Sequence, residues 1–216
     1  RGANSSMSRW RFNGGRMTRE HMQFLADSIR KYNLQHVHFT TGQCLQMHGL
    51  DGDTILNLFK ECHEHGIYNR GAGGDNPNVV ASILRGIDPR ETLDITPYAA
   101  AISEFLMEQM FYIKLPRKFK MAIDNGFDST PHTTFKDLGF NLTKYNTFDV
   151  YACGGLGPNP RMGIPVAHDV QPEDVLYYVL ITVISRTVAK LVHVTCRLKW
   201  VEPKLSLKPM KKPWLW

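Results

Sequence analysis

The sequence predicts an α+β protein built from two successive units. Between residues 18 and 33 the apolar residues recur at i, i+3, i+4 and i+7, which is the spacing of an amphipathic helix. Residues 36–40 and 43–48 alternate between polar and apolar, as half-buried strands do. A glycine-rich connector, residues 70–77, then separates this region from a longer one with a similar mixture of patterns.

Composition indicates a globular chain with an anionic partner. The 216 residues are 43% hydrophobic and 21% charged, so wholesale disorder is not expected. The net charge of +6 is spread along the chain, and only the lysines of the tail suggest nucleic acid, which we therefore do not expect as a partner. The longest apolar run, residues 175–184, is too short to span a bilayer, and no signal peptide is visible. We expect no membrane association and a cytoplasmic location.

The first unit is predicted from residue 9 to residue 70, after a leader or tag remnant at residues 1–8. A strand at 9–13 closes with a turn at Gly14 and Gly15, and Thr18 caps a helix that ends near Asn33. The two alternating strands follow, and Asp51 or Asp53 opens a second helix that stops at Gly66. Its buried side is predicted to hold Ile55, Leu56, Leu58, Phe59 and Cys62. The order fits helices on one face of an antiparallel sheet.

The second unit is predicted from residue 71 to residue 202, with a basic tail at 203–216. A short helix is expected over residues 78–84, and a firmer one is capped by Thr96 with Pro97 in its first turn. Its apolar stripe is Ile102, Phe105, Leu106 and Met110. Strands are expected at 135–140, 147–152 and 194–201. A long helix runs from Pro172 to about Lys190, with a core stripe of Val175, Leu176, Val179, Leu180 and Val183.

A lysine-rich stretch, residues 115–120, precedes the apolar residues 121–123. If the stretch is a strand, Lys118 and Lys120 project from one face and Phe119 and Met121 from the other. Two ammonium groups about 7 Å apart suit a small oxyanion or a polycarboxylate. The alternative is an edge strand whose lysines keep it soluble.

Other motifs carry weaker signals. The Gly154-Gly155-Leu156-Gly157 loop lacks the spacing of a dinucleotide site, and a tight turn is its alternative. His36 and His38 are better explained as polar positions than as metal ligands. The cysteines, Cys44, Cys62, Cys153 and Cys196, form no Cys-x-x-Cys pair, so no metal site and no cysteine-held cluster is predicted.

Five motifs in order resemble the N-terminal half of the sirohaem-dependent nitrite and sulfite reductases. Residues 40–49, TTGQCLQMHG, resemble the family's T-x-R-Q-x-x-Q-x-H-G, and residues 74–79 resemble its G-D-N-x-R-N-V. Residues 115–120 match L-P-R-K-F-K, residues 137–140 with 154–157 match D-L-G-F and G-G-L-G, and residues 197–199 match R-L-K. The resemblance implies a ferredoxin-like half-domain followed by a mixed α/β sirohaem-reductase-type domain.

The resemblance also implies roles for individual residues. Lys118 and Lys120 would face sulfite or nitrite during its multi-electron reduction. The residues implied in contacts with the sirohaem are Gln43, His48, Asn76, Arg117, Gly154, Gly155, Gly157, Arg161, Arg197 and Lys199. An electron donor is implied as a partner, and the [4Fe–4S] cluster would have to come from another chain. A second reductase half, or a homodimer that imitates the family's two similar halves, is implied too.

Two departures from the family pattern leave an alternative open. Gly42 stands where the family has the arginine of T-x-R-Q, and the arginine of G-D-N-x-R-N-V is absent, since Pro77 runs straight into Asn78. The family's cluster cysteines are missing as well. The chain is therefore interpreted either as a subunit or fragment of an oxidoreductase, or as a non-catalytic relative that keeps the fold and binds a tetrapyrrole or an anion without turnover.

Overall fold

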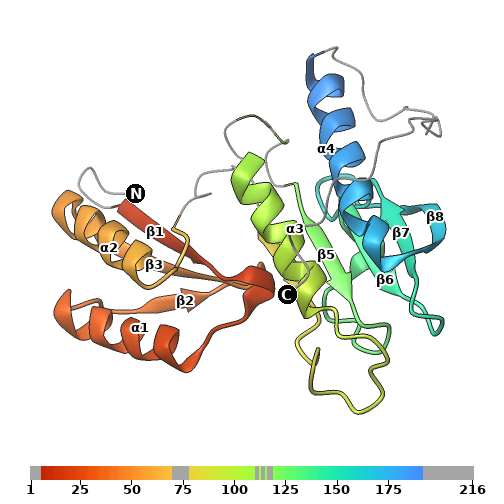
Figure 1. The fold of residues 1–216 in the computed structure, drawn as a ribbon. Helices are drawn as coiled ribbons and strands as arrows, with labels where there is room; N and C mark the ends of the chain where they lie inside the picture. The colour runs from red at the N-terminus through yellow and green to blue at the C-terminus, as the bar shows by residue number, and fades with distance from the viewer. Residues whose placement is uncertain (1–5, 70–77, 110–111, 113–114, 116–118, 192–216) are drawn as a thin grey trace.

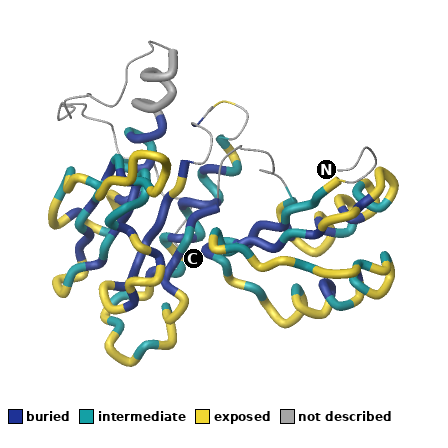
Figure 2. Tube along the Cα trace, turned by 180° about the vertical axis from the view of Figure 1, so that it is seen from behind, coloured by how far each residue is buried: buried dark blue, intermediate teal, exposed yellow. Residues whose placement is uncertain are grey.

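Two α+β units follow one another along the chain (Figure 1). The structure is a computed structural model that describes residues 6–69, 78–109, 112, 115 and 119–191, with side chains described up to residue 183 of the last helix. Each unit has its own buried core, and the buried trace runs through the central strands of each (Figure 2). The α+β class predicted from the sequence is confirmed.

The first unit is a three-stranded antiparallel sheet with two helices on one face. Its elements are β1 (Ser6–Arg11), the short 3-10 helix η1 (Asn13–Gly15), α1 (Arg19–Lys31), β2 (Val37–Phe39), β3 (Cys44–Leu50) and α2 (Gly52–Glu64). The strands lie in the order β1-β3-β2. Trp10 stacks on Phe24 of α1 with ring centroids 5.1 Å apart, and Leu58 of α2 is fully buried in the same core. The helices therefore cover the face that carries Trp10, Leu45 and Met47.

The helix ends of this unit follow the predicted signals. The Thr18 hydroxyl accepts a hydrogen bond from the His21 amide, and the Asp51 carboxylate accepts one from the Thr54 amide. Gly66 lies just beyond α2 with φ at 66°, a conformation that favours glycine. The predicted buried side of α2 is partly wrong, because Leu56 and Phe59 are 62% and 42% exposed.

The second unit is a five-stranded mixed sheet with α3 and α4 on one face (Figure 1). Its elements are β4 (Val79–Ala81), α3 (Thr96–Glu108), β5 (Met121–Asp124), η3 (Thr133–Phe135), β6 (Leu138–Leu142), β7 (Phe148–Ala152), β8 (Ile164–Val170), η4 (Pro172–Asp174) and α4 (Val175–Leu191). The strand order is β4-β5-β6-β7-β8, with β4, β5 and β6 parallel and the remaining pairs antiparallel. Ile102 and Leu106 of α3 and Val179 of α4 are buried in one core with the strands.

Four predictions for this unit are corrected. Residues 79–81 form strand β4 rather than a helix, and β8 was not predicted at all. The strand predicted over residues 115–123 begins only at Met121, so Lys120 lies just before it. β5 pairs with both β4 and β6, which rules out the alternative of a solubilising edge strand. The cap of α3 is Ile95 rather than Thr96, and the Asp94 carboxylate accepts the Thr96 amide hydrogen.

The first strand begins within the predicted leader. Ser6, Met7 and Ser8 belong to β1, although the predicted leader included them. The connector at 70–77, Met110, the strand predicted at 194–201 and the tail lie outside the described residues. Among the helices of the described part, none is both long enough and apolar enough to cross a membrane.

The two units are joined by a side-chain clamp. The Gln43 amide nitrogen donates to the Ala81 carbonyl at 2.6 Å, and its oxygen accepts from the Ala81 amide at 2.9 Å. Asn78 donates from its side chain to the carbonyl oxygens of Gly42 and Gln43 at 3.1 and 3.0 Å. η1 packs against β4 and α3 beside this clamp. The tip of the β2–β3 hairpin therefore lies against the start of the second sheet.

Candidate anion-binding site

The amino ends of β4, β5, β6 and β8 and the carboxyl end of β7 lie along one side of the second sheet, and this side carries positive charge. Met121 is in register with both Val79 and Leu138, and Leu138 is in register with Ala152, which pairs with Ile164. The residues just before β4, β5, β6 and β8 and just after β7 therefore lie in a row. We call the group of Lys120, Lys136, Gly154, Gly155 and Arg161 in this row the basic edge.

The main chain of Lys120 is held on the neighbouring segment. Its amide donates to the Asp137 carboxylate at 2.9 Å, and its carbonyl accepts the Leu138 amide at 3.2 Å. The Lys120 side chain is exposed. The segment that contains Lys118 and Arg117 lies outside the described residues, as do Asn76, Arg197 and Lys199. For these five residues the roles implied by resemblance stay predictions.

The glycine-rich loop after β7 packs tightly at its first glycine. A Cβ on Gly154 would meet the Phe135 backbone at 2.6 Å, so a side chain there would push the loop off the segment before β6. Gly155 and Arg161 exchange two backbone hydrogen bonds of 3.0 and 2.9 Å, which close the loop. Gly157 has open space around it. The loop therefore fixes the main chain of Arg161 within the basic edge.

A second cationic surface lies on the sheet face of the first unit that the helices leave uncovered. Strand alternation places Arg9, Arg11 and Gln46 on this face, together with His38 and His48. Gln46, with its carbonyl oxygen turned toward β1, accepts two hydrogen bonds from the Arg9 guanidinium. The strands β1, β2 and β3 contain no acidic residue. We call this surface the open sheet face.

Sequence reasoning missed Arg9, Arg11 and Gln46 as site residues. The signal was present, because Arg9 and Arg11 are two positions apart on a predicted strand and must share a face. Arg11 is 3% exposed, and burial lowers the pKa of its guanidinium, while the nearby Cys44 raises it and Arg9 lowers it further.

Gln43 lies just before β3 and His48 is its fifth residue, so the two are about 16 Å apart along the strand. Both arms of the Gln43 amide are engaged with Ala81, so this side chain joins the units. His48 stacks on His36 with ring centroids 6.1 Å apart and bonds to Gln46 at 3.3 Å. His48 therefore belongs to the open sheet face, whereas Gln43 belongs to the joint.

The cysteines of the described part do not fit a four-cysteine cluster. Cys44 and Cys62 are buried in the first unit, and burial raises the pKa of the Cys62 thiol to about 12. Cys153 lies at the basic edge of the other unit. Within the described residues, no group of three or more histidine, cysteine or acidic side chains could hold a metal ion. We therefore derive no step through an iron–sulfur cluster held by these residues.

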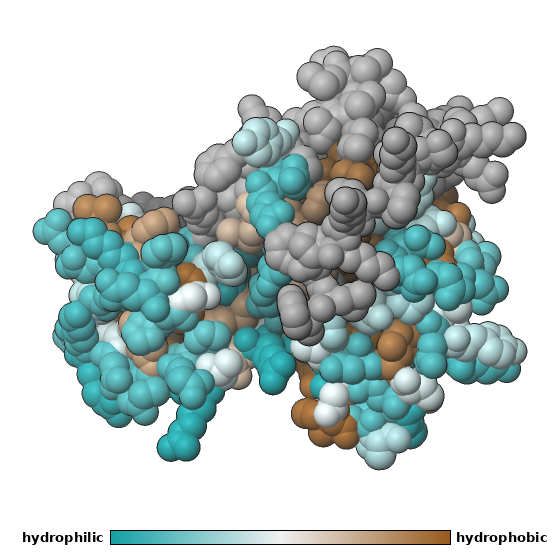
Figure 3. Space-filling view, in the orientation of Figure 1, coloured by the Kyte–Doolittle hydropathy of each residue, from teal (hydrophilic) through white to brown (hydrophobic). Residues whose placement is uncertain are grey.

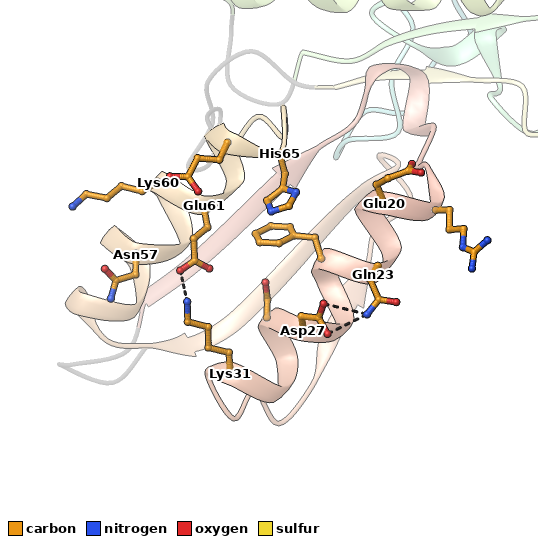
Figure 4. A pocket seen from close by; sticks show the side chains of 12 residues that line it. Glu20, Gln23, Asp27, Lys31, Asn57, Lys60, Glu61 and His65 are labelled. Atoms are coloured by element: carbon orange, nitrogen blue, oxygen red, sulfur yellow. Dashed lines mark hydrogen bonds and ion pairs between the residues drawn. The ribbon is translucent and has the colours of Figure 1, made fainter.

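A hollow of about 970 Å³ lies elsewhere, between α1 and α2 (Figure 4). Some of its polar side chains pair with one another. Lys31 bonds to Glu61 at 2.7 Å, and Gln23 donates to Asp27 at 3.1 Å. The surface of this unit is largely hydrophilic where it is visible (Figure 3). The lining of the hollow mixes acidic and basic side chains, so the hollow lacks the positive excess of the basic edge.

Two carboxylates in the second unit have structural partners. Burial raises the pKa of Asp124, whose carboxylate accepts hydrogen bonds from the Gly126 amide and the Thr133 hydroxyl. Burial also acts to raise the pKa of Asp128, but hydrogen bonds from Thr130, Ser82 and a backbone amide lower it overall. Asp124 is the last residue of β5 and Asp128 follows the strand, whereas the basic edge lies at the amino end of β5. They hold loops together and are not candidates for the site.

Comparison with known families decides the assignment. The family described as "Nitrite and sulphite reductase 4Fe-4S domain" matches residues 72–185 of the chain, and the family described as "Nitrite/Sulfite reductase ferredoxin-like half domain" matches residues 2–65. The chain belongs to the nitrite and sulfite reductase family. The ferredoxin-like nature of the first unit, predicted from the sequence, is confirmed by this match.

Individual relatives agree with the assignment. A ferredoxin–nitrite reductase of Synechococcus elongatus is 29% identical over 163 residues, which cover 73% of this chain and 30% of the relative. A chloroplastic ferredoxin–nitrite reductase of Spinacia oleracea is 28% identical over 187 residues, covering 79% and 30%. A protein named sulfite reductase [ferredoxin] 1, from Mycolicibacterium paratuberculosis, is 26% identical over 176 residues, covering 77% and 31%.

The chain spans about a third of the length of these relatives. Its fold is similar to the structure of the Mycobacterium tuberculosis NirA protein, with a TM-score of 0.69 at 23% identity, covering 85% of this chain and 34% of that one. This likeness extends over both units of the chain and confirms the architecture.

Proposed function

We propose that this chain is a sirohaem-binding portion of a nitrite or sulfite reductase and binds the anions of that reaction at the basic edge. The observation that carries the proposal is that Lys120, Lys136 and Arg161 come from three separate segments whose main chains meet at one sheet edge, where the charge of Lys120 acts on Lys136. A small oxyanion needs positive charge from several directions, and these segments supply it.

The open sheet face supports the sirohaem part of the proposal. Sirohaem carries several carboxylates, and a face with Arg9, His38 and His48 but no acidic strand residue suits them. When bound, the group would supply the iron at which the substrate is reduced. The lysines of this chain would orient the substrate, stabilise charge on its oxygens and deliver protons. The cluster and its cysteines would come from sequence other than these 216 residues.

Spectroscopy of the purified chain tests the proposal. Sirohaem added to the chain is expected to give a Soret-type absorption that stays with the protein through gel filtration. Arg9→Ala is expected to weaken the retention, whereas Arg19→Ala, a change at an exposed position at the start of α1, leaves it unchanged. A chain that remains colourless after addition of sirohaem refutes the proposal.

The role of the lysines needs a second half of the enzyme. In a preparation reconstituted with a complementary reductase half, Lys118→Ala and Lys120→Ala are expected to lower turnover by roughly tenfold to a thousandfold, as loss of a transition-state donor does. Lys144→Ala, on the turn between β6 and β7, is the control. Unchanged turnover in both lysine variants contradicts their catalytic role.

Gly42, which stands where the family pattern has an arginine, favours a second candidate. The chain would then be a non-catalytic relative that binds a tetrapyrrole or an anion. Retained sirohaem without turnover in any reconstitution distinguishes this candidate from the first. Sedimentation of the chain at high concentration shows whether it forms the homodimer that the family's two similar halves suggest, and a monomer rejects the dimer.

A further inference from the structure

Lys136 belongs to none of the sequence motifs, yet it lies at the centre of the basic edge. It follows η3 and comes two residues before β6, and its carbonyl accepts the Gly154 amide at 2.9 Å. Its side chain is neither fully buried nor fully exposed. The Nζ atom lies 5.4 Å from the centre of the Phe135 ring. The residue is therefore held in place by both its main chain and its neighbours.

Hydrogen bonds of Lys136 and its neighbours connect it to a segment that carries a cation on each side. On one side, Lys120 donates to the carboxylate of Asp137, the residue that follows Lys136. On the other, Gly154 bonds to Lys136, and the adjacent Gly155 bonds to Arg161 at 3.0 Å. Lys136 is thus the middle member of a row of three cations that come from three segments of the chain.

The electrostatics of this row are unfavourable without an anion. Burial lowers the pKa of Lys136, and the positive charge of Lys120 lowers it further, while Asp137 raises it. The charged side chains that act on it are Lys120 and Asp137. Two lysines beside one carboxylate leave an excess of positive charge. A bound anion offsets such an excess.

We propose that Lys136 is an anion-binding residue of the basic edge and holds anionic oxygens together with Lys120. The inference rests on the proposed function and adds to it a residue from outside the matching motifs. The oxygens belong either to a small oxyanion such as nitrite or to a tetrapyrrole carboxylate, because both present the same charged acceptor to an ammonium group. A lysine that loses its proton readily can also pass it to a reduced oxygen.

Competitive labelling of the whole chain tests the inference. An amine-acylating ester at pH 7.5 is applied with nitrite, with uroporphyrin, or with sodium chloride at equal ionic strength, and acylation of each lysine is followed by mass spectrometry. Nitrite or uroporphyrin is expected to slow acylation of both Lys136 and Lys120 at least threefold relative to chloride. The exposed Lys144 serves as the internal control and should not change.

The two ligands separate the two sources of anionic oxygens. Protection by nitrite assigns Lys136 to the small oxyanion, and protection by uroporphyrin alone assigns it to the macrocycle. Protection of Lys120 without Lys136 overturns the inference and leaves the proposed function standing, whereas protection of neither lysine overturns both. Lys136→Gln should also reduce the protection of Lys120, and Lys144→Gln should not. Circular dichroism confirms that both variants are folded.

Discussion

Replacing Gln43 with alanine should loosen the joint between the two units. The substitution removes the hydrogen bonds of 2.6 and 2.9 Å to the backbone of Ala81, a residue with no exposed surface. A buried backbone group left without a partner costs about 1–3 kcal/mol. Two such groups predict that the free energy of unfolding falls by about 2–6 kcal/mol. Gln43 has a φ of 53°, and alanine keeps the same left-handed strain, so that contribution cancels.

Urea unfolding followed by circular dichroism measures this loss. Gln35→Ala is a matched control, because the same side chain is removed from an exposed position and the cost should stay within about 0.5 kcal/mol. The joint is also expected to stop coupling the units, so that two unfolding transitions separate. If Gln43→Ala and Gln35→Ala differ by less than about 0.5 kcal/mol, the clamp does not hold the units together.

Two further predictions concern a glycine and a carboxylate. A Cβ on Gly15 (φ 75°) would meet the Gln43 side chain at 2.6 Å, whereas a Cβ on Gly49 (φ 77°) would have open space. Gly15→Ala should therefore destabilise the chain by at least about 1 kcal/mol more than Gly49→Ala in the same urea assay. Equal losses of stability would mean that only backbone strain matters. Hydrogen bonds from Arg90 lower the pKa of Asp88 to about 2, so the stability that this pair contributes is present above the ordinary aspartate pKa and disappears as the pH falls toward 2. Arg90→Ala should raise the pKa of Asp88, measured by NMR titration, and an unchanged pKa would contradict the pairing of Asp88 with Arg90.

The first unit could be predicted well because its signals are local. Thr18 and Asp51 carry capping side chains, Gly66 ends a helix, and the hairpin strands alternate cleanly. Each of these features acts within a few residues of the chain. The errors arose where burial depends on distant partners. Leu56 and Phe59 are apolar and helical, but no element of the described part covers them.

The second unit was harder to predict because its strands are short and its central pairs are parallel. Val79, Val80 and Ala81 form a strand only through pairing with β5, more than forty residues away, and a three-residue apolar run is ambiguous by itself. β8 contains Pro165 and is largely exposed on its first residues, so it lacks the usual strand pattern. Burial on both faces likewise hid where β5 begins.

The candidate site could be predicted by resemblance only in part. The motifs pointed to Lys120, the Gly154 loop and Arg161, and the structure brings these together at one edge. Lys136 could not be found in this way. Between Phe135 and Asp137 it looks like an ordinary polar residue, and only the register of β5 against β6 brings it next to Lys120.

The clamp at Gln43 also covers part of the outer edge of the second sheet at β4. β4 is the last strand on that side, and an open strand edge invites pairing with the backbone of another molecule. The Gln43 amide presents one donor and one acceptor to Ala81, as a peptide group of a further strand would. A glutamine side chain thus takes the place of a sixth strand at Ala81. The second unit without the β2–β3 hairpin would expose this edge of β4 and is expected to aggregate. The two units are therefore best expressed together.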